Sequence, residues 1–452
     1  MNFAESAALQ QLLKKRGWTE GSIDDCDILI INTCSVRITA ETRVFGRLGL
    51  FSAMKKKRHF SLLLMGCMAQ RLHDSIKKDF PQLDYVVGMF EREQFSAIFE
   101  SIERKQTWEA SAAAMPLHAA AVSSGAETDN SPRYHFSNCS YTEGAFQSFV
   151  PIMNGCNNFC TYCIVPYIRG REISRPPQDI LSEIVFLAGK GVREITLLGQ
   201  NVNSYCGQDP LSGKPVLFPA LLRQAASVCR EHDTIRWIRF LSNHPKDISD
   251  EVITVMAEEK RICKALHLPV QHGSDKILAR MNRRYTRADY LRLIEKLRSK
   301  MPDIVLTTDI LIGFPGESPE DFEQTLQLMR EVRFDSAFMY HYNPREGTKA
   351  YEFFDRIPDA VRLCRLQQVI DLQMRITEEK MRSRLGTVTE ILIESHSRDN
   401  PDELFGHTEQ GEMTVLTEKC DAKYIGHFMK VQLQSIKGKT FRAVPIHKED
   451  ML

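Results

Sequence analysis

The sequence has no long hydrophobic run and almost no net charge. No apolar stretch approaches the roughly 20 residues that a membrane-spanning helix needs, so a membrane protein is not predicted. The first residues, Met1–Ser6, carry neither the basic nor the apolar stretch of a secretory signal peptide. The 59 Lys and Arg residues nearly balance the 58 Asp and Glu residues, which leaves a net charge of +1. Any nucleic-acid site must therefore be a local patch.

Cysteine, by contrast, is abundant. The chain has 12 cysteines and no sign of secretion, which favours a reducing compartment and thiolate metal ligands over a disulfide framework. We therefore expect a cytoplasmic protein. A chain of 452 residues with 43% hydrophobic content is large enough for about two to four domains with their own cores.

Three of the cysteines are closely spaced. Cys156, Cys160 and Cys163 form the pattern C-x3-C-x2-C. Three thiolates can hold three corners of a four-iron cluster, which leaves one iron open to a small chelating molecule. A zinc site would want a fourth Cys or His at regular spacing, and the odd count disfavours disulfides. The motif therefore predicts a catalytic iron–sulfur cluster.

This motif, with an aromatic residue before its last cysteine, resembles the signature of the radical S-adenosylmethionine (SAM) superfamily. The longer string 154–170, followed by Ser174-Arg175-Pro176, resembles the methylthiotransferase branch. In that superfamily the open iron binds the amino and carboxylate groups of SAM, and reduction yields methionine and a 5′-deoxyadenosyl radical. The resemblance implies that Cys156, Cys160 and Cys163 are cluster ligands with a catalytic role.

Residues 1–105 are predicted to form a small α/β domain. Apolar runs at 27–31, 61–65 and 84–87 alternate with helical segments, which indicates a parallel sheet. Cys34 and Cys67 each follow a strand, at the edge where such sheets bind ligands, although a buried cysteine without a ligand would look the same. The strings 32–37 and 66–71 resemble two of the three auxiliary-cluster motifs of methylthiotransferases. The resemblance thus implies a second [4Fe–4S] cluster.

The third auxiliary motif of that family is a Gly-Cys-Gln followed by Met-Asn, at the end of a first strand. This sequence begins at Met1-Asn2, so the matching cysteine and strand would precede residue 1. We therefore expect an N-terminally shortened chain, whose auxiliary cluster lacks its third cysteine. Cys26 and Cys139 lie in unsuitable places to replace it.

Residues 106–141 are predicted to be a linker, and residues 142–378 a partial barrel of six βα units, as in the radical SAM fold. The strands are expected at 149–153, 194–198, 234–240, 265–270, 304–312 and 336–342, and helices at 178–187, 250–259, 287–299 and 319–332. Polar residues collect after these strands, where βα barrels place their chemistry. The residues predicted to bind SAM are Tyr162, Gln200, Asn201, Ser242, Gln271 and Gly313. His244 and His272 are better interpreted as satisfied structural residues.

The C-terminal part changes to a period of two. A long helix at 363–385, interpreted as a solvated linker, precedes strands at 387–394, 411–416, 426–433 and 440–444, with turns at Asp402, Gly406 and Gly438. This pattern indicates a small OB-like β-barrel over residues 379–446 and resembles the TRAM domain of tRNA-modifying enzymes. The predicted RNA contacts are Arg169, Arg175, Lys430, Lys437, Lys439 and Arg442.

The whole resemblance implies a tRNA methylthiotransferase that modifies C2 of N6-isopentenyladenosine at position 37, with two [4Fe–4S] clusters and SAM. The string Leu198–Ser204 resembles the isopentenyladenosine branch. Alternatives are methylthiolation of threonylcarbamoyladenosine or of a ribosomal-protein aspartate, or a chain that cleaves SAM and binds RNA without thiolation. The implied partners are tRNA and an electron donor such as flavodoxin or ferredoxin, with the enzyme a monomer that does not bind membranes.

Overall fold

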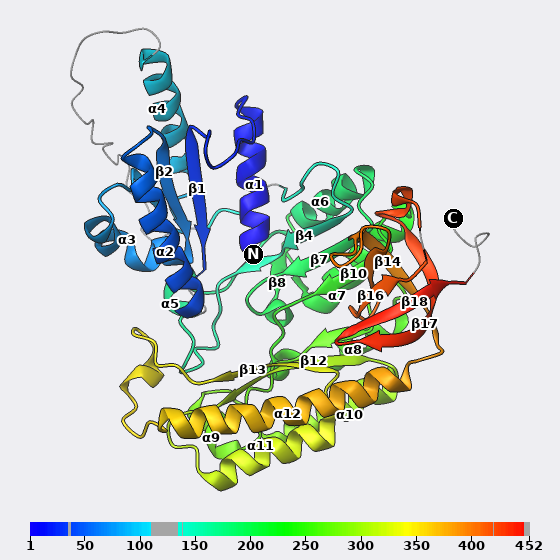
Figure 1. The fold of residues 1–452 in the computed structure, drawn as a ribbon. Coiled ribbons are helices and arrows are strands. Elements are labelled where there is room, and N and C mark those ends of the chain that lie inside the picture. The colour runs from blue at the N-terminus through cyan, green and yellow to red at the C-terminus, as the bar shows by residue number, and fades with distance from the viewer. Residues whose placement is uncertain (35–37, 110–133, 138, 419, 447–452) are drawn as a thin grey trace. The chain divides into compact units, whose positions relative to one another are not determined.

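The computed structural model describes residues 1–34, 38–109, 134–137, 139–418 and 420–446 (Figure 1). The predicted linker segment 110–133 and residues 35–37 of the first auxiliary motif lie outside the described residues. The chain divides into two compact units. The N-terminal unit contains residues 2–137 and 164–173, and the core unit contains Met1, 138–163 and 174–452.

The N-terminal unit is built on a parallel three-stranded sheet. Its strands are β1 (Ile28–Thr33), β2 (Ser61–Gly66) and β3 (Tyr85–Val87), in the order β1-β2-β3, which confirms the predicted strands. Its helices are α1 (Asn2–Lys15), α2 (Ile38–Lys55), α3 (Cys67–Asp79), α4 (Gln94–Glu109) and α5 (Val165–Arg169). Leu62 and Leu64 pack into one hydrophobic cluster while Leu63 packs into another, so β2 is buried on both faces. This double burial is why its sequence is a continuous apolar run.

The core unit contains the six expected strands. They are β4 (Gln147–Pro151), β7 (Glu194–Leu198), β10 (Trp237–Phe240), β11 (Ala265–His267), β12 (Val305–Ile312) and β13 (Ser336–His341). They form two parallel sheets, ordered β10-β7-β4 and β11-β12-β13, and a parallel bridge between Ile238 and Ile262 connects the two. The predicted partial barrel of six βα units is confirmed.

Helices cover the outside of these strands. They are α6 (Pro177–Gly189), α7 (Phe218–His232), α8 (Asp250–Glu258), α9 (Asp275–Arg280), α10 (Arg287–Lys300), α11 (Pro319–Val332) and α12 (Asp359–Ser383). Short strands lie between these elements: β5 (Met153–Asn154), β6 (Ile173–Ser174), β8 (Cys206–Gln208) and β9 (Pro215–Leu217). α11 begins where the sequence predicts, because Ser318 and Asp321 form a reciprocal capping box at its first turn.

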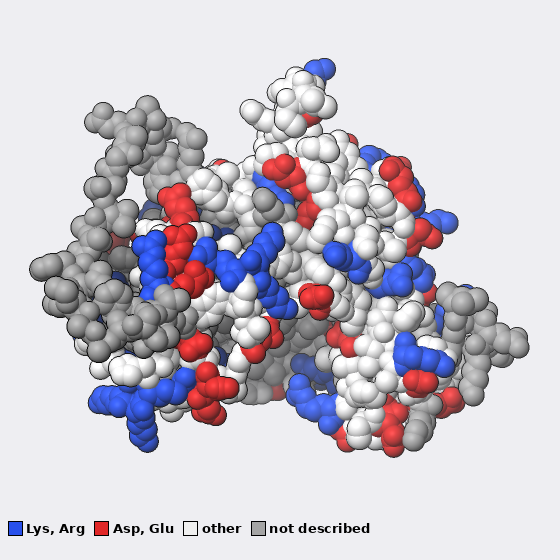
Figure 2. Space-filling view, turned by 90° about the horizontal axis from the view of Figure 1, so that it is seen from above, with Lys and Arg blue, Asp and Glu red and all other residues white. Residues whose placement is uncertain are grey.

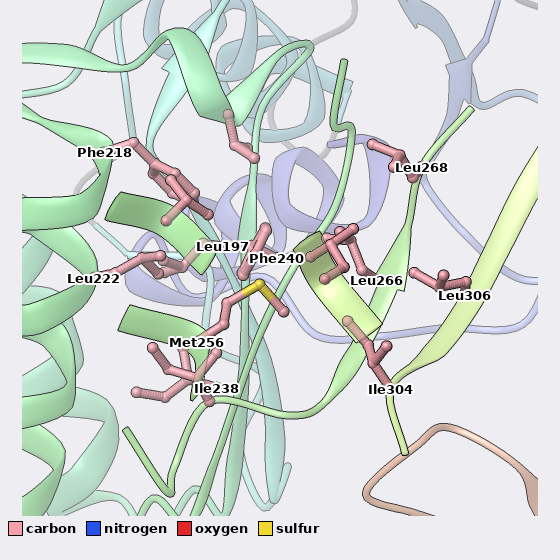
Figure 3. Close-up of a cluster of buried hydrophobic side chains, with 14 of the residues drawn as sticks. Leu197, Phe218, Leu222, Ile238, Phe240, Met256, Leu266, Leu268, Ile304 and Leu306 are labelled. Carbon is pink, nitrogen blue, oxygen red and sulfur yellow. The ribbon is translucent and has the colours of Figure 1, made fainter. Parts of the chain in front are cut away.

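The hydrophobic core lies between the strands and these helices. In Figure 3, side chains from α7, β7, β10, α8 and β11 point toward one another, with Phe218 of α7 against Phe240 of β10 at a ring-centroid distance of 5.2 Å. The long helix α12 belongs to this core, because Val369, Leu372 and Ile376 are buried within it. The interpretation of α12 as a solvated linker is therefore wrong: one side of the helix packs against the barrel.

The C-terminal part of the core unit is a closed five-stranded barrel. Its strands are β14 (Val388–His396), β15 (Leu404–Thr408), β16 (Met413–Leu416), β17 (Phe428–Lys437) and β18 (Thr440–Pro445), in the order β14-β15-β16-β18-β17. The turn predicted at Gly406 is wrong, because Gly406 lies inside β15 opposite Ile393. A Cβ atom there would be 2.3 Å from the carbonyl oxygen of Leu392, so this glycine permits close strand approach.

This barrel contacts the βα strands through a polar network. His407 of β15 pairs through Nε2 with Glu194 of β7 at 2.9 Å and through Nδ1 with Glu394 of β14. Arg239 of β10 donates to the carbonyl oxygen of Glu409 at 2.7 Å. Burial would lower the pKa of His407, but the two carboxylates outweigh it, and the pKa is raised above its usual value.

This network predicts a pH-dependent contribution to stability. Because its folded pKa is raised, His407 stabilises fully below about pH 6.5, its unfolded value, and loses this contribution as pH rises through the folded pKa. We expect His407→Gln to destabilise by about 1–3 kcal/mol at pH 6 and by less at pH 9. The measurement is the urea midpoint by tryptophan fluorescence, with the exposed His427→Gln as control. An equal loss at both pH values would contradict the prediction.

Candidate functional site

The three closely spaced cysteines lie on one loop of the core unit. The loop follows β5, just beyond the C-terminal end of β4, so it begins at the edge where βα barrels bind ligands. Cys160 is buried, while Cys156 and Cys163 are partly exposed. The backbone N–H of Cys163 donates to the carbonyl oxygen of Cys160 at 2.9 Å, which closes a tight turn. None of the twelve cysteines, all within the described part of the chain, forms a disulfide.

A segment far along the chain holds this loop in place. Asn282, just after α9, donates to the carbonyl oxygens of Asn158 at 3.1 Å and Phe159 at 2.9 Å. The backbone N–H of Thr161 donates to the carbonyl oxygen of Met281 at 3.0 Å. Asn282 has a φ of 59°, a left-handed conformation that asparagine tolerates better than most residues. The sequence analysis missed this contact, because more than a hundred residues separate its two sides.

Gln200, one of the residues predicted to bind SAM, also supports the loop. Its side-chain oxygen accepts a hydrogen bond at 2.7 Å from the backbone N–H of Gly155, directly before Cys156. Gln200 follows β7, so the amide links the end of one strand to the start of the cysteine loop. The structure therefore gives Gln200 a positioning contact with the loop.

Four buried polar atoms near the ends of β7 and β10 have no hydrogen-bond partner among the described residues. They are Oδ1 of Asn201, Nδ2 of Asn203, Oδ1 of Asn243 and Nε2 of His244. The two segments are in contact, because the N–H of His244 donates to Oδ1 of Asn203 at 3.3 Å. Burial, with help from nearby cations, lowers the pKa of His244 to about 2, so its ring is neutral. Unpaired buried donors and acceptors are costly, and a polar ligand such as SAM would satisfy them.

Two of the predicted residues at strand ends have left-handed backbones. Ser242 has a φ of 70° and Gln271 a φ of 71°, which is unusual for residues other than glycine. Gln271 is buried and extends the sheet, because its N–H donates to the carbonyl oxygen of Asp309 at 2.9 Å. Such conformations concentrate at ligand-binding positions, where the surrounding fold holds them.

The loop that begins at Gly313 is organised by one buried carboxylate. Glu317 accepts hydrogen bonds from the N–H groups of Gly313 at 2.6 Å and Phe314 at 3.3 Å. It also contacts Nε2 of His272 at 3.1 Å and pairs with Arg365 of α12. Its partners therefore come from the loop, the end of β11 and α12.

The remaining residues of this region also have clear surroundings. Tyr162 packs edge-on against Phe314, at a ring-centroid distance of 6.5 Å, so the cysteine loop meets the Gly313 loop. Gly313 itself has a φ of 65°, and a Cβ atom there would be 2.5 Å from the side chain of Arg362. Glycine is therefore required at this position on two counts.

Cys34 and Cys67 come together within the N-terminal unit. Parallel pairing places Thr33 opposite Gly66, so both cysteines follow directly from paired residues. Gly66 has a φ of 97°, and a Cβ atom there would be 2.5 Å from the carbonyl oxygen of Thr33. Burial raises the pKa of the Cys67 thiol, the nearby Arg169 lowers it, and Cys34 adds to the rise.

The predicted RNA-binding arginines are buried in ion pairs. Arg169, in the N-terminal unit, pairs with Glu5 at 3.1 Å. Arg175, in the core unit, pairs with Glu183 and donates to the carbonyl oxygen of Pro151 at 3.3 Å. RNA contact by either arginine stays a prediction, and it would require the side chain to leave these partners.

The basic residues of the C-terminal barrel differ in their surroundings. Lys430 and Lys439 are exposed, whereas Lys437 pairs with Asp399 at 3.1 Å and Arg442 pairs with Glu403. On the face shown in Figure 2, blue Lys and Arg atoms are interspersed with red Asp and Glu atoms. This agrees with the small net charge. Lys437 is exposed as well, so Lys430, Lys437 and Lys439 are all accessible at the surface.

Among the described residues, no three His, Cys, Asp or Glu side chains are arranged to hold one ion. The cysteine loop offers three sulfurs beside a set of unsatisfied polar atoms, which is the donor set that a cluster with a chelating ligand would use. No helix in the described part of the chain is both long and apolar enough to cross a bilayer.

Three known families match consecutive parts of the chain. Residues 1–88 match the uncharacterized protein family UPF0004, residues 150–329 the Radical SAM superfamily, and residues 382–446 the TRAM domain. The order is the one that the sequence predicts.

Curated relatives match almost the full length. A protein of Treponema pallidum named tRNA-2-methylthio-N(6)-dimethylallyladenosine synthase is 60% identical over 98% of this chain and 96% of its own. A protein of the same name from Treponema denticola is 56% identical over 98% of this chain and 97% of its own. Another, from Carboxydothermus hydrogenoformans, is 41% identical over 98% of this chain and 95% of its own. Among solved structures, the radical SAM methyltransferase TsrM of Kitasatospora setae shares the fold with a TM-score of 0.52 and 14% identity, covering 75% of this chain and 68% of that one.

Proposed function

This chain belongs to the radical SAM methylthiotransferases named tRNA-2-methylthio-N(6)-dimethylallyladenosine synthases, and we propose that it methylthiolates C2 of N6-dimethylallyladenosine (isopentenyladenosine) at position 37 of tRNA. The observation that carries this proposal is the cysteine loop at the C-terminal edge of a six-stranded barrel, in a chain 60% identical to such a synthase over nearly its whole length. The other substrates considered, threonylcarbamoyladenosine and a ribosomal-protein aspartate, have no comparable support.

The chain's own residues divide into ligands and supports. We propose that Cys156, Cys160 and Cys163 hold the cluster, and that the unpaired atoms of Asn201 and His244 bind SAM. When bound, cluster and SAM supply a carbon-centred radical that can remove hydrogen from an aromatic C–H bond, which no general base can deprotonate. The neutral ring of His244 adds no positive charge to this region.

The N-terminal unit would hold the sulfur that is transferred. We propose that Cys34 and Cys67 would be ligands of a second [4Fe–4S] cluster, which would supply the sulfur for transfer. Their support is the parallel register that places both at neighbouring strand ends. A third ligand is not identified among the residues described.

The TRAM barrel would contribute RNA affinity. We propose that the exposed Lys430 and Lys439 contact phosphate groups of the anticodon arm. The target adenosine would leave its stack to reach the cysteine loop at the edge of the βα barrel. This unstacking costs little free energy in a single-stranded loop. We further propose a monomer in the cytoplasm, where tRNA is modified, with flavodoxin or ferredoxin as electron donor.

The test is a reconstituted reaction. We expect protein with iron and sulfide restored anaerobically, given a reductant and SAM, to convert N6-dimethylallyladenosine in tRNA into its 2-methylthio derivative, detected by mass spectrometry of nucleosides. A matched tRNA that carries threonylcarbamoyladenosine should stay unchanged. SAM cleavage without methylthiolation of either tRNA would contradict the proposal and favour a chain that binds RNA and cleaves SAM only.

A further inference from the structure

Arg283 lies buried beside one cysteine of the loop. It is 4% exposed, and its Nη1 donates to Sγ of Cys160 at 3.5 Å. Its two other nitrogens are anchored, Nη2 on the carbonyl oxygen of Pro269 at 2.7 Å and Nε on the hydroxyl of Tyr285 at 3.0 Å. Because these anchors fix the planar guanidinium on two sides, its remaining edge is held toward the sulfur.

The electrostatic surroundings of Arg283 are unusual. Among the described residues it forms no ion pair with Asp or Glu, and the groups that favour its charge most are Tyr285, Tyr162 and Cys160. A buried guanidinium without an anionic partner is strongly unfavourable. Among the groups to which Arg283 donates, Cys160 is the one that the proposed function makes anionic, because a cluster ligand is held as a thiolate. The geometry therefore makes Arg283 the counter-ion of a cluster ligand.

We propose that Arg283 raises the reduction potential of the SAM-binding cluster by donating an N–H···S hydrogen bond to Cys160. The inference rests on the proposed function, which makes Cys160 a cluster ligand. One-electron reduction adds a negative charge to the cluster and its thiolates, and a fixed positive charge stabilises that state more than the oxidised one. Hydrogen bonds to cluster sulfurs act in the same direction. Arg283 is thus a positioning residue that acts through Cys160.

The chain offers a matched control beside this residue. Arg284 is exposed and carries the same charge one position further along. Its charge is screened by solvent and should have little effect on a buried cluster. Comparison of Arg283→Gln with Arg284→Gln therefore separates the effect of the buried charge from that of the net charge.

The experiment is a redox titration of the cluster followed by electron paramagnetic resonance. All variants are made in the full chain with Cys34→Ala, which removes one of the two proposed auxiliary ligands, so that the loop cluster gives the only signal, and SAM is left out. At the midpoint potential of the parent, we expect Arg283→Gln to lower the ratio of reduced to oxidised cluster at least tenfold, equivalent to a shift of about 59 mV. Arg283→Lys, which keeps the charge, should lower it by less, and Arg284→Gln should leave it unchanged.

Two results would overturn the inference. One is a parent-like potential in Arg283→Gln at full iron content. The other is loss of the cluster in both Arg283 variants with retention in Arg284→Gln, because Arg283 would then act in assembly. If the parent itself assembled no cluster, iron analysis would reveal this before any titration, and the proposed function would fail together with the inference.

Discussion

Alanine at Cys163 is expected to abolish reductive cleavage of SAM, with a loss of at least about 100-fold. Removing one of three thiolates leaves a cluster with two protein ligands and a second exposed iron. Cys163 is the best of the three to change, because it is partly exposed, whereas Cys160 is buried and contacts Arg283. The backbone hydrogen bond from residue 163 to Cys160 does not depend on the side chain, so the loop should keep its turn.

The measurements are 5′-deoxyadenosine formation and iron content per chain after reconstitution. Cys206→Ala is the control, because Cys206 is exposed on β8 in the same unit and outside the motif. We expect the control to retain both the iron and the activity of the parent. If Cys163→Ala kept both, the assignment of the loop as the cluster site would be wrong.

Alanine at Cys34 is expected to separate the two halves of the reaction. Methylthiolation of tRNA should fall below detection, while SAM cleavage stays within about twofold of the parent, because the loop cysteines lie in the other compact unit. Iron should fall by up to about four atoms per chain if a second cluster forms. Cys34 is preferred over Cys67, since Cys67 is buried beside Arg169 and its removal would also disturb the packing.

The matched control for this change is Cys26→Ala. Cys26 is also partly exposed and lies just before β1, at the end of the strand opposite Cys34. It should leave both methylthiolation and SAM cleavage unchanged. Loss of SAM cleavage in Cys34→Ala would show that the two sites are not independent. Loss of methylthiolation in Cys26→Ala would show that the auxiliary site had been assigned to the wrong end of the sheet.

Sequence reasoning succeeded where local pattern and tertiary position agree. β7 and α11 have the predicted bounds, because an apolar run buried on both faces and a capping box are local signals. Sequence reasoning missed β15, because a glycine such as Gly406 is typical of a turn. In the fold, Gly406 instead allows two strands to approach closely. The role of α12 was missed for a related reason: its charged residues suggest solvation, yet its apolar residues are buried on one side.

The candidate site also has a part that the sequence predicts and a part that it does not. The ligating cysteines were predictable, since their spacing is a motif within eight residues. Their supports were not, because Asn282 and Arg283 lie more than a hundred positions away and form no recognisable pattern with the loop. Such long-range contacts are set by how the barrel closes, and a single sequence carries no direct record of that.

The carboxylate of Glu317 also bears on how a stand-alone catalytic fragment should be cut. The stretch that matches the Radical SAM superfamily stops at residue 329, before β13 and α12. A fragment trimmed there would lose Arg365 and leave the buried Glu317 carboxyl group, which holds the Gly313 loop, without its guanidinium partner. An excised catalytic part must therefore include α12, through residue 383, so its physical boundary lies at least about fifty residues beyond the boundary of its sequence match.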